Sequence, residues 1–181
     1  HVYNKNKYEE MINDYYPQVD RLAAIFWDVN NLKCVNDKYG HAAGDVLIQT
    51  LSSVLYELST DRRKVYRIGG DEFIVLIKDV TIEELSIMLK AMRKGLKVSL
   101  AQKQPEYMFS TSIGIAQFGK DGSDFETLFK IADAALYIAK EKGKDRYIIY
   151  DYNKHGDILA DMKHDIASVS YTHLTLPTNS L

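Results

Sequence analysis

Residues 65–77 read Val-Tyr-Arg-Ile-Gly-Gly-Asp-Glu-Phe-Ile-Val-Leu-Ile, and this stretch decides the fold. Its two apolar runs, 65–68 and 73–77, have the length and the β-branched and aromatic content of strands. The residues between them, 69–72, begin with two glycines, which let the backbone turn tightly and leave room for a ligand to approach. We therefore predict a β-hairpin with the adjacent carboxylates of Asp71 and Glu72 at its tip.

Asp28 ends another short apolar run, 22–27, which predicts a buried strand. If that strand lies beside the hairpin in one sheet, Asp28 and Asp71 can face each other. Carboxylates a few ångströms apart repel each other unless a cation lies between them. Mg²⁺ suits such a site, because it takes hard oxygen ligands and shares its shell with substrate phosphates. With the backbone carbonyl of Val29, the two aspartates predict a site for metal-assisted phosphoryl transfer.

Each feature alone has an ordinary structural explanation. A carboxylate at a strand end is usually just solvated, and Gly-Gly-Asp is a common turn. The five-residue run 69–73 resists that explanation, because average residue frequencies put its chance occurrence on the order of 10⁻⁶ per position.

The remaining hydrophobic pattern predicts a mixed sheet with helices packed against it. Apolar residues at helical spacing predict helices over 8–16, 32–39, 43–58, 81–92 and 124–143. Thr81 is expected to cap the fourth of these helices, with Glu84 three residues on. Further strands are predicted over 108–118 and 147–150. This order of elements predicts an α+β fold or α/β sandwich.

The composition describes one domain. The chain has 181 residues, of which 46% are hydrophobic, and this is enough for a single core. A net charge of −2 offers no basic footprint, so we expect no nucleic-acid polymer as a partner. A few placed cations can still hold a nucleotide.

Cys34 is the one cysteine, so no internal disulfide forms, which fits a reducing compartment. Beside Val35, it is predicted to be a buried thiol rather than a nucleophile. No apolar run is long enough to cross a membrane, and no signal peptide is present. We expect a soluble cytoplasmic domain without membrane contact, free or as the cytoplasmic part of a membrane-anchored protein.

Both ends suggest where the domain stops. The chain enters a helical pattern almost at once, which suggests that an upstream part is missing. We place the domain at residues 1–152 and treat 153–181 as a C-terminal extension. Residues 168–181 are rich in Ser and Thr and have no core periodicity, so they read as a non-native tail or, alternatively, a native disordered extension.

Gly69-Gly70-Asp71-Glu72-Phe73 is the signature of GGDEF domains, and the chain resembles that diguanylate cyclase family in further blocks. Residues 28–45 resemble the family pattern D-x-D-x-F-K-x-x-N-D-x-x-G-H-x-x-G-D. Residues 112–116 resemble its S-I-G-(I/V)-A strand, and residues 133–140 its D-x-A-L-Y-x-A-K helix. The likeness covers roughly residues 2–152. It implies a five-stranded mixed sheet surrounded by helices, similar to the palm of nucleotidyl cyclases and polymerases.

The resemblance also implies roles for individual residues. Asp28, Asp71 and the Val29 carbonyl would bind Mg²⁺, with Mn²⁺ as a substitute. Asp71 would accept the proton of an attacking 3′-hydroxyl, and Glu72 would support the same cluster. Lys33 would stabilise negative charge on the phosphoryl groups.

For the substrate, the resemblance implies a pocket for GTP. Asn36 and Asp45 would read the guanine edge, and His41 would line the pocket. Lys140 and Lys144 would hold the terminal phosphates. Two domains in a two-fold homodimer would each present one GTP, and each 3′-hydroxyl would attack the other's α-phosphate to form cyclic di-GMP and two pyrophosphates. An upstream sensory domain is expected in the full-length protein.

The chain departs from the family pattern at several positions. Asn30 replaces the second aspartate of D-x-D, Leu32 replaces an aromatic residue, and Lys144 replaces an arginine. The product-inhibition motif R-x-x-D reads Thr-Asp-Arg-Arg here, with Thr60 and Arg63 at its defining positions. We expect feedback inhibition through that site to be weak or absent.

Two alternatives to an active cyclase stay open on the sequence. One is a catalytically weak domain that binds GTP or a cyclic dinucleotide as a regulatory module. The other is a palm-type nucleotidyltransferase that makes a different cyclic dinucleotide. The intact signature and metal aspartate favour the active cyclase.

Overall fold

Helices and strands follow one another in the predicted order in the computed structural model, which describes residues 2–14, 16, 19, 21–57, 59–103, 110–157 and 160. The elements are α1 (Lys5–Asp14), β1 (Leu22–Asn30), α2 (Leu32–Tyr39), α3 (His41–Glu57), β2 (Arg63–Arg67), β3 (Glu72–Lys78), α4 (Ile82–Lys103), β4 (Ser110–Gln117), α5 (Phe125–Glu141) and β5 (Arg146–Ile149).

The five strands form one mixed sheet in the order β2-β3-β1-β4-β5. The central strand β1 is antiparallel to both β3 and β4, and β4 is parallel to β5. All nine residues of β1 are buried, which explains why its sequence is a continuous apolar run rather than an alternating one. The prediction that the first strand lies beside the hairpin is confirmed, with Asp28 opposite Glu72.

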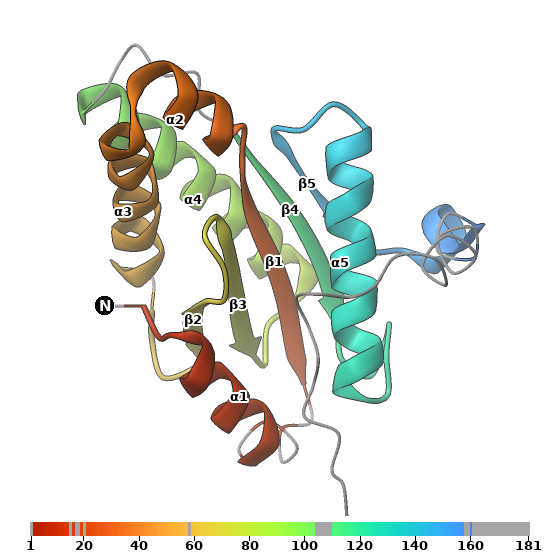
Figure 1. Ribbon diagram of the computed structural model, residues 1–181. Coiled ribbons are helices and arrows are strands. Elements are labelled where there is room, and N and C mark those ends of the chain that lie inside the picture. The colour runs from red at the N-terminus through yellow and green to blue at the C-terminus, as the bar shows by residue number, and fades with distance from the viewer. Residues whose placement is uncertain are drawn as a thin grey trace, which may run out of the picture.

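Helices cover both faces of the sheet (Figure 1). Alternate side chains of β1, such as Ile25 and Trp27, pack in one cluster with apolar residues of α3 and α4. The intervening side chains, such as Phe26, pack in a second cluster with α1 and α5. Helices α1, α3, α4 and α5 bury apolar residues against the sheet, so the predicted α/β sandwich around a five-stranded mixed sheet is confirmed.

Helix α5 lies unusually close to the sheet at Gly114 of β4. A Cβ atom at that position would come within 2.1 Å of the Ala132 carbonyl oxygen and of the Leu136 backbone nitrogen. Only glycine permits this approach.

Element ends differ from the predictions by a few residues. Strand β1 continues to Asn30, two residues past Asp28, and the Asn30 side chain is bonded to β4 there. Its Nδ2 donates to the Ser110 hydroxyl (3.0 Å), and its Oδ1 accepts from the Ser112 hydroxyl (2.9 Å). The capping box of α4 is confirmed. The Thr81 backbone amide donates to Glu84 Oε2 (2.9 Å), and the Glu84 backbone amide donates to Thr81 Oγ1 (3.2 Å). Met108 and Phe109 of the predicted fourth strand lie outside the described residues.

The prediction of a buried thiol at Cys34 is wrong. Cys34 is exposed, and its neighbour Val35 is the buried residue of α2. Successive helical residues point about 100° apart, so adjacent positions on a short amphipathic helix do not share its buried face.

The segment after β5 includes a helical turn over residues 152–157. Its His155 is buried, and its ring lies 5.9 Å from that of Tyr150. The boundary at residue 152 and the origin of the tail remain predictions, and residues 168–181 lie outside the described part.

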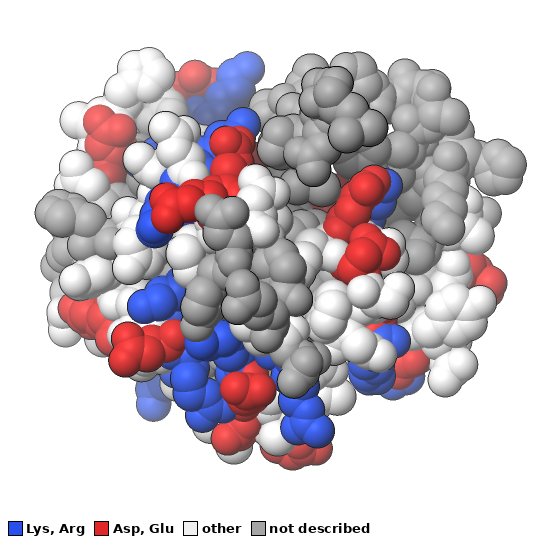
Figure 2. All heavy atoms as spheres, turned by 90° about the horizontal axis from the view of Figure 1, so that it is seen from below, with Lys and Arg blue, Asp and Glu red and all other residues white. Residues whose placement is uncertain are grey.

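Across the ranges that the structure describes, no helix has the length and apolarity that a membrane span requires. On the face at the end of the molecule away from α2, acidic and basic side chains are interspersed (Figure 2).

Candidate active site

The tip of the β2–β3 hairpin is held by Arg67. Its guanidinium donates from Nε to the Gly69 carbonyl (3.2 Å) and from Nη2 to the Gly70 carbonyl (2.8 Å). Two donors in a rigid fork fix both carbonyls at once. Arg67 has no predicted role in the sequence pattern. A donor-rich side chain just before a glycine turn was the available signal, but its target is set by the backbone path.

The two glycines of the hairpin have different surroundings. A Cβ atom on Gly69 would lie 2.6 Å from the Glu72 Oε2 atom, whereas a Cβ atom on Gly70 would meet nothing within 4 Å. Neither glycine is among the residues with positive φ. Gly69 therefore provides room for the Glu72 carboxylate, and the turn itself needs no glycine-only conformation.

Asp71 lies beside the end of β1, close to Asp28. The Val29 amide donates to the Asp71 carbonyl at 3.2 Å, which attaches the hairpin tip to the strand end. Burial raises the pKa of the Asp28 carboxyl, and the negative charge of Asp71 adds to that rise. The charges of Lys140 and Lys144 lower the Asp28 pKa without cancelling the rise.

The ammonium group of Lys140 partly neutralises the negative charge at this end of the sheet. Lys140, in the last turn of α5, places its Nζ 2.8 Å from Asp28 Oδ2, and the Asp28 side chain is 10% exposed. Lys144 donates from Nζ to the Asn31 side-chain oxygen at 3.0 Å. Asn31 stands at the head of α2 in a left-handed conformation (φ 60°), with its side chain turned to Lys144 rather than capping the helix.

The donor set fits a divalent cation that has further ligands from outside the protein. Among the described residues, no cluster of three or more His, Cys, Asp or Glu side chains is positioned to bind a metal. A buried carboxylate whose pKa is raised by a second carboxylate is the electrostatic setting that a cation relieves. Mg²⁺ commonly takes only one or two protein carboxylates and completes its shell with phosphates and water.

The other predicted substrate residues lie on α2 and at the start of α3. Asn36 is half-buried, and its side-chain oxygen Oδ1 has no hydrogen-bond partner in the described structure. That oxygen packs where a Cβ atom on Gly44 would be, only 2.0 Å away. Lys33, His41 and Asp45 are exposed, and within the described ranges no ion pair or hydrogen bond joins them to Asp28 or Asp71.

The site therefore forms in two parts. Asp28, Asp71, Glu72, Lys140 and Lys144 gather around the end of β1. Lys33, Asn36, His41 and Asp45 stand on the following helices. The part at β1 has carboxylates, which can bind a cation, and ammonium groups, which can bind phosphates. This combination suits a nucleoside triphosphate and its counter-ion.

A family model described as "Diguanylate cyclase, GGDEF domain" matches residues 1–146. The chain belongs to the GGDEF family. Its fold is that of the solved GGDEF domains, and the predicted family membership is confirmed.

The chain is also similar to individual known proteins. The chain is 35% identical over 131 residues to signaling protein YkoW of Bacillus subtilis, covering 71% of this chain and 16% of YkoW. It is 35% identical over 127 residues to diguanylate cyclase DosC of Escherichia coli, covering 69% of this chain and 27% of DosC. A sensory box/GGDEF family protein from Caulobacter crescentus superposes with a TM-score of 0.64 at 31% identity, covering 78% and 95% of the two chains. The chain thus spans less than a third of the two curated relatives.

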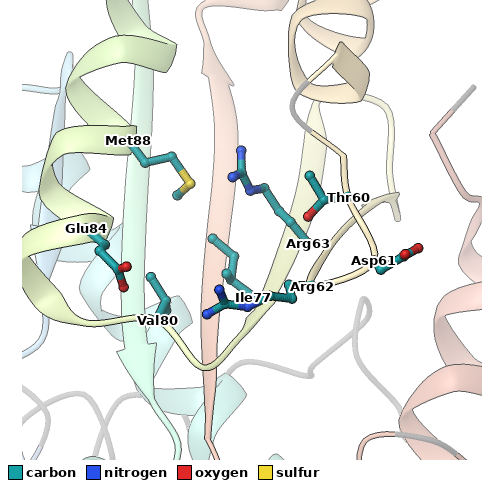
Figure 3. Close-up of a pocket in the computed structure, with 8 residues that line it drawn as sticks. All are labelled: Thr60, Asp61, Arg62, Arg63, Ile77, Val80, Glu84 and Met88. Atoms are coloured by element: carbon teal, nitrogen blue, oxygen red, sulfur yellow. The ribbon is translucent and has the colours of Figure 1, made fainter.

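A separate hollow of about 500 Å³ lies at the other end of the hairpin (Figure 3). It is lined by Thr60, Asp61, Arg62, Arg63, Ile77, Val80, Glu84 and Met88. The Arg63 Nε atom is buried and has no hydrogen-bond partner among the described residues. Burial, and then the charge of Arg62, lower the Arg63 pKa. The hollow contains Thr60 and Arg63, the positions of the altered product-inhibition motif.

Proposed function

We propose that this GGDEF domain is a diguanylate cyclase that condenses two GTP molecules into cyclic di-GMP and two pyrophosphates. The observation that carries the proposal is that the hairpin tip is bonded to the end of β1 beside the Lys140–Asp28 ion pair, which brings Asp71 near Asp28. The intact signature and the relatives named as cyclases support the same conclusion.

Asp28, Asp71 and the Val29 carbonyl would hold Mg²⁺, or Mn²⁺ in its place. When bound, such an ion supplies positive charge that stabilises the phosphoryl oxygens. Asp71 would accept the proton from the 3′-hydroxyl, with Glu72 beside it. Lys33 would stabilise charge developing on the phosphoryl group.

Lys140 and Lys144 are proposed to bind the terminal phosphates. The charges of both lysines lower the pKa of the Asp28 carboxyl, so both favour negative charge at this end of the sheet. In the free protein Lys140 is paired with Asp28 at 2.8 Å. We infer that Lys140 would release this carboxylate and bind a phosphate oxygen when Asp28 serves as a ligand of a bound cation.

Asn36 would read the guanine base. Its unpartnered Oδ1 is an acceptor, and guanine presents N1–H and N2–H donors. In the free protein this oxygen packs against Gly44, so the Asn36 side chain would have to turn toward the base to accept from it. Asp45 would accept a second guanine donor, and His41 would line the pocket.

The proposed condensation of two GTP molecules requires two domains. In a two-fold dimer, each 3′-oxygen forms a bond to the α-phosphorus of the opposite GTP, and the bond to pyrophosphate breaks. Each attack passes one proton to Asp71, and two attacks close the ring. We further propose that the domain is the cytoplasmic output part of a longer protein with an upstream sensory domain.

Incubation with GTP and Mg²⁺, followed by chromatography, tests the proposal. Cyclic di-GMP is the expected product, and turnover per domain should rise with protein concentration. The Asp71→Ala variant should fold with unchanged circular dichroism and form no product. Saturable GTP binding without turnover would instead indicate a regulatory binding module, and mixed cyclic dinucleotides would indicate a different nucleotidyltransferase.

A further inference from the structure

The turn between α5 and β5 contains three consecutive residues with positive φ: Gly143 (101°), Lys144 (58°) and Asp145 (43°). The first is accounted for by the end of α5. The Lys144 amide donates to the Ala139 carbonyl (3.1 Å), and the Gly143 amide to the Lys140 carbonyl (3.2 Å), which is the Schellman arrangement with glycine in the left-handed position. Lys144 and Asp145 carry a Cβ atom and need another reason to stay left-handed.

Two basic residues of α4 hold Asp145. Arg93 Nη2 donates to the Asp145 carboxylate (2.9 Å) and also to its backbone carbonyl (2.5 Å). Lys97, one helical turn further along α4, donates to the other carboxylate oxygen at 3.2 Å. Because Arg93 binds the main chain as well as the side chain, it restrains the backbone of Asp145 itself.

The charges around Asp145 support this description. Partial burial raises the pKa of the Asp145 carboxyl, but the hydrogen bonds and charges of Arg93 and Lys97 outweigh burial, so the net shift is downward. The Arg93 side chain is 22% exposed, which places this contact partly out of water, where it weakens less with salt.

The consequence falls on Lys144, the neighbour of Asp145. Lys144 belongs to no helix or strand, so the turn sets the position of its backbone and the direction in which its side chain leaves it. In this conformation its Nζ reaches the Asn31 side chain at the head of α2, at 3.0 Å, and its charge acts on Asp28.

We propose that Arg93, Lys97 and Asp145 form an ionic clamp that positions Lys144 for the terminal phosphates of the nucleotide. The three are positioning residues, since they act through Lys144. The phosphate part of this inference rests on the proposed function.

The Asp145→Asn variant tests the clamp with the least disturbance. Asparagine keeps the shape and tolerates the left-handed conformation, so the change removes mainly the charge. With Mg²⁺ present, calorimetry should show affinity for a non-hydrolysable GTP analogue falling about fivefold, as for one lost charge-assisted contact, while affinity for GMP stays the same. In a Lys144→Ala background, Asp145→Asn should add no further loss. Glu126→Gln, which removes the exposed Glu126–Lys130 pair of α5, is the matched control and should change neither affinity.

Amide hydrogen exchange provides a reading that does not depend on the nucleotide. Asp145→Asn should speed exchange at the Lys144 amide, because the bond to Ala139 is held by the turn. Unchanged exchange overturns the clamp, whatever binds. Two results would overturn the role toward the phosphates. One is an equal loss of affinity for the GTP analogue and for GMP in Asp145→Asn. The other is a loss of affinity for the GTP analogue that Asp145→Asn causes in the Lys144→Ala background as fully as in the wild type. A third outcome separates the two proposals: the wild-type protein binds no GTP analogue, yet the Lys144 amide still exchanges faster in the Asp145→Asn variant than in the wild type. This result would contradict the proposed function and the role toward the phosphates, but it would support the clamp on the turn.

Discussion

At the tip of the β2–β3 hairpin, Gly69 and Gly70 are chemically identical neighbours with different tasks. Gly69 is needed because the Glu72 carboxylate occupies the space beside it, and Gly70 has open space. Alanine at position 69 therefore tests the packing against Glu72, and alanine at position 70 tests whether the open space serves a ligand.

We expect Gly69→Ala to lower the free energy of unfolding by about 1 kcal/mol, because the Glu72 side chain must move. Gly70→Ala should stay within about 0.5 kcal/mol of wild type, since the methyl group meets nothing and the unfolded chain is slightly restricted. Urea denaturation measures both. If the open space at Gly70 serves an approaching ligand, Gly70→Ala should still weaken binding of the GTP analogue. Equal stability losses in the two variants would contradict the assigned roles.

Asp133 on α5 gives a prediction for pH. Burial raises the pKa of its carboxyl above the ordinary 3.8, and the charge of Lys140 only partly opposes this. Between 3.8 and the raised value, the folded state holds more protons than the unfolded state, so stability falls as pH rises through this interval.

Asp133→Asn should therefore raise the thermal unfolding midpoint at pH values above the raised pKa of the Asp133 carboxyl, where the wild-type carboxyl is charged. The difference from wild type should shrink as the pH is lowered and disappear below 3.8, where the carboxyl is protonated in both states. Scanning calorimetry over a pH series measures this. A variant that is less stable than wild type above the raised pKa would show that the Asp133 charge stabilises the fold.

At the scale of elements, the contact between α5 and β4 depends on Gly114. The backbone of Ala132 and Leu136 fills the position of a Cβ atom there, and backbone cannot rotate away as a side chain can. The same contact sets the height of α5 over the sheet, and hence where Lys140 reaches Asp28.

Gly114→Ala should lower the free energy of unfolding by about 3 kcal/mol, at the upper end for an overpacked core. Gly95→Ala is the matched control, because Gly95 lies within α4 and has nothing within 4 Å of an added Cβ. It should raise stability by about 0.5–1 kcal/mol, the usual gain from glycine to alanine in a helix. Denaturant titration of both variants gives the values. A neutral Gly114→Ala would mean that α5 can move away from the sheet without loss.

Element types were predictable because hydrophobic periodicity reports which face is buried. The run at 22–27 predicted a buried strand, and all residues of β1 are buried because helices cover both faces of the sheet. The position of single side chains was less predictable. Cys34 follows the apolar rhythm in sequence, yet α2 buries only Val35, because a short helix on the edge of the fold shows most of its surface to water.

The centre of the candidate site was predictable for a local reason. Asp28 ends a strand and Asp71 stands in a hairpin, so their meeting required only that the two strands be neighbours. The contacts of Arg67 and Asp145 were not predictable from the sequence. Arg67 binds carbonyls whose directions depend on the turn, and Arg93 lies 52 residues from Asp145. Neither residue type nor spacing encodes such a contact.

At the scale of the whole molecule, the hollow of Figure 3 lies at the end of β3 away from the signature. With Arg63 at the position of the motif's aspartate, we expect cyclic di-GMP not to inhibit the domain through this surface at low micromolar concentration. Restoring the family pattern with Thr60→Arg and Arg63→Asp together should create inhibition, measured as cyclic di-GMP formation with added product. Strong inhibition of the wild type that Thr60→Arg with Arg63→Asp leaves unchanged would contradict this.

The central claim is that Asp28 and Asp71, from separate parts of the chain, share one divalent cation beside the nucleotide. Electron paramagnetic resonance of Mn²⁺ titrated into the protein with a non-hydrolysable GTP analogue tests it directly. Asp28→Asn and Asp71→Asn should each weaken Mn²⁺ binding by at least about tenfold, and the double variant, which lacks both carboxylate ligands, should bind more weakly than either single variant. Wild-type affinity in either single variant would contradict the claim.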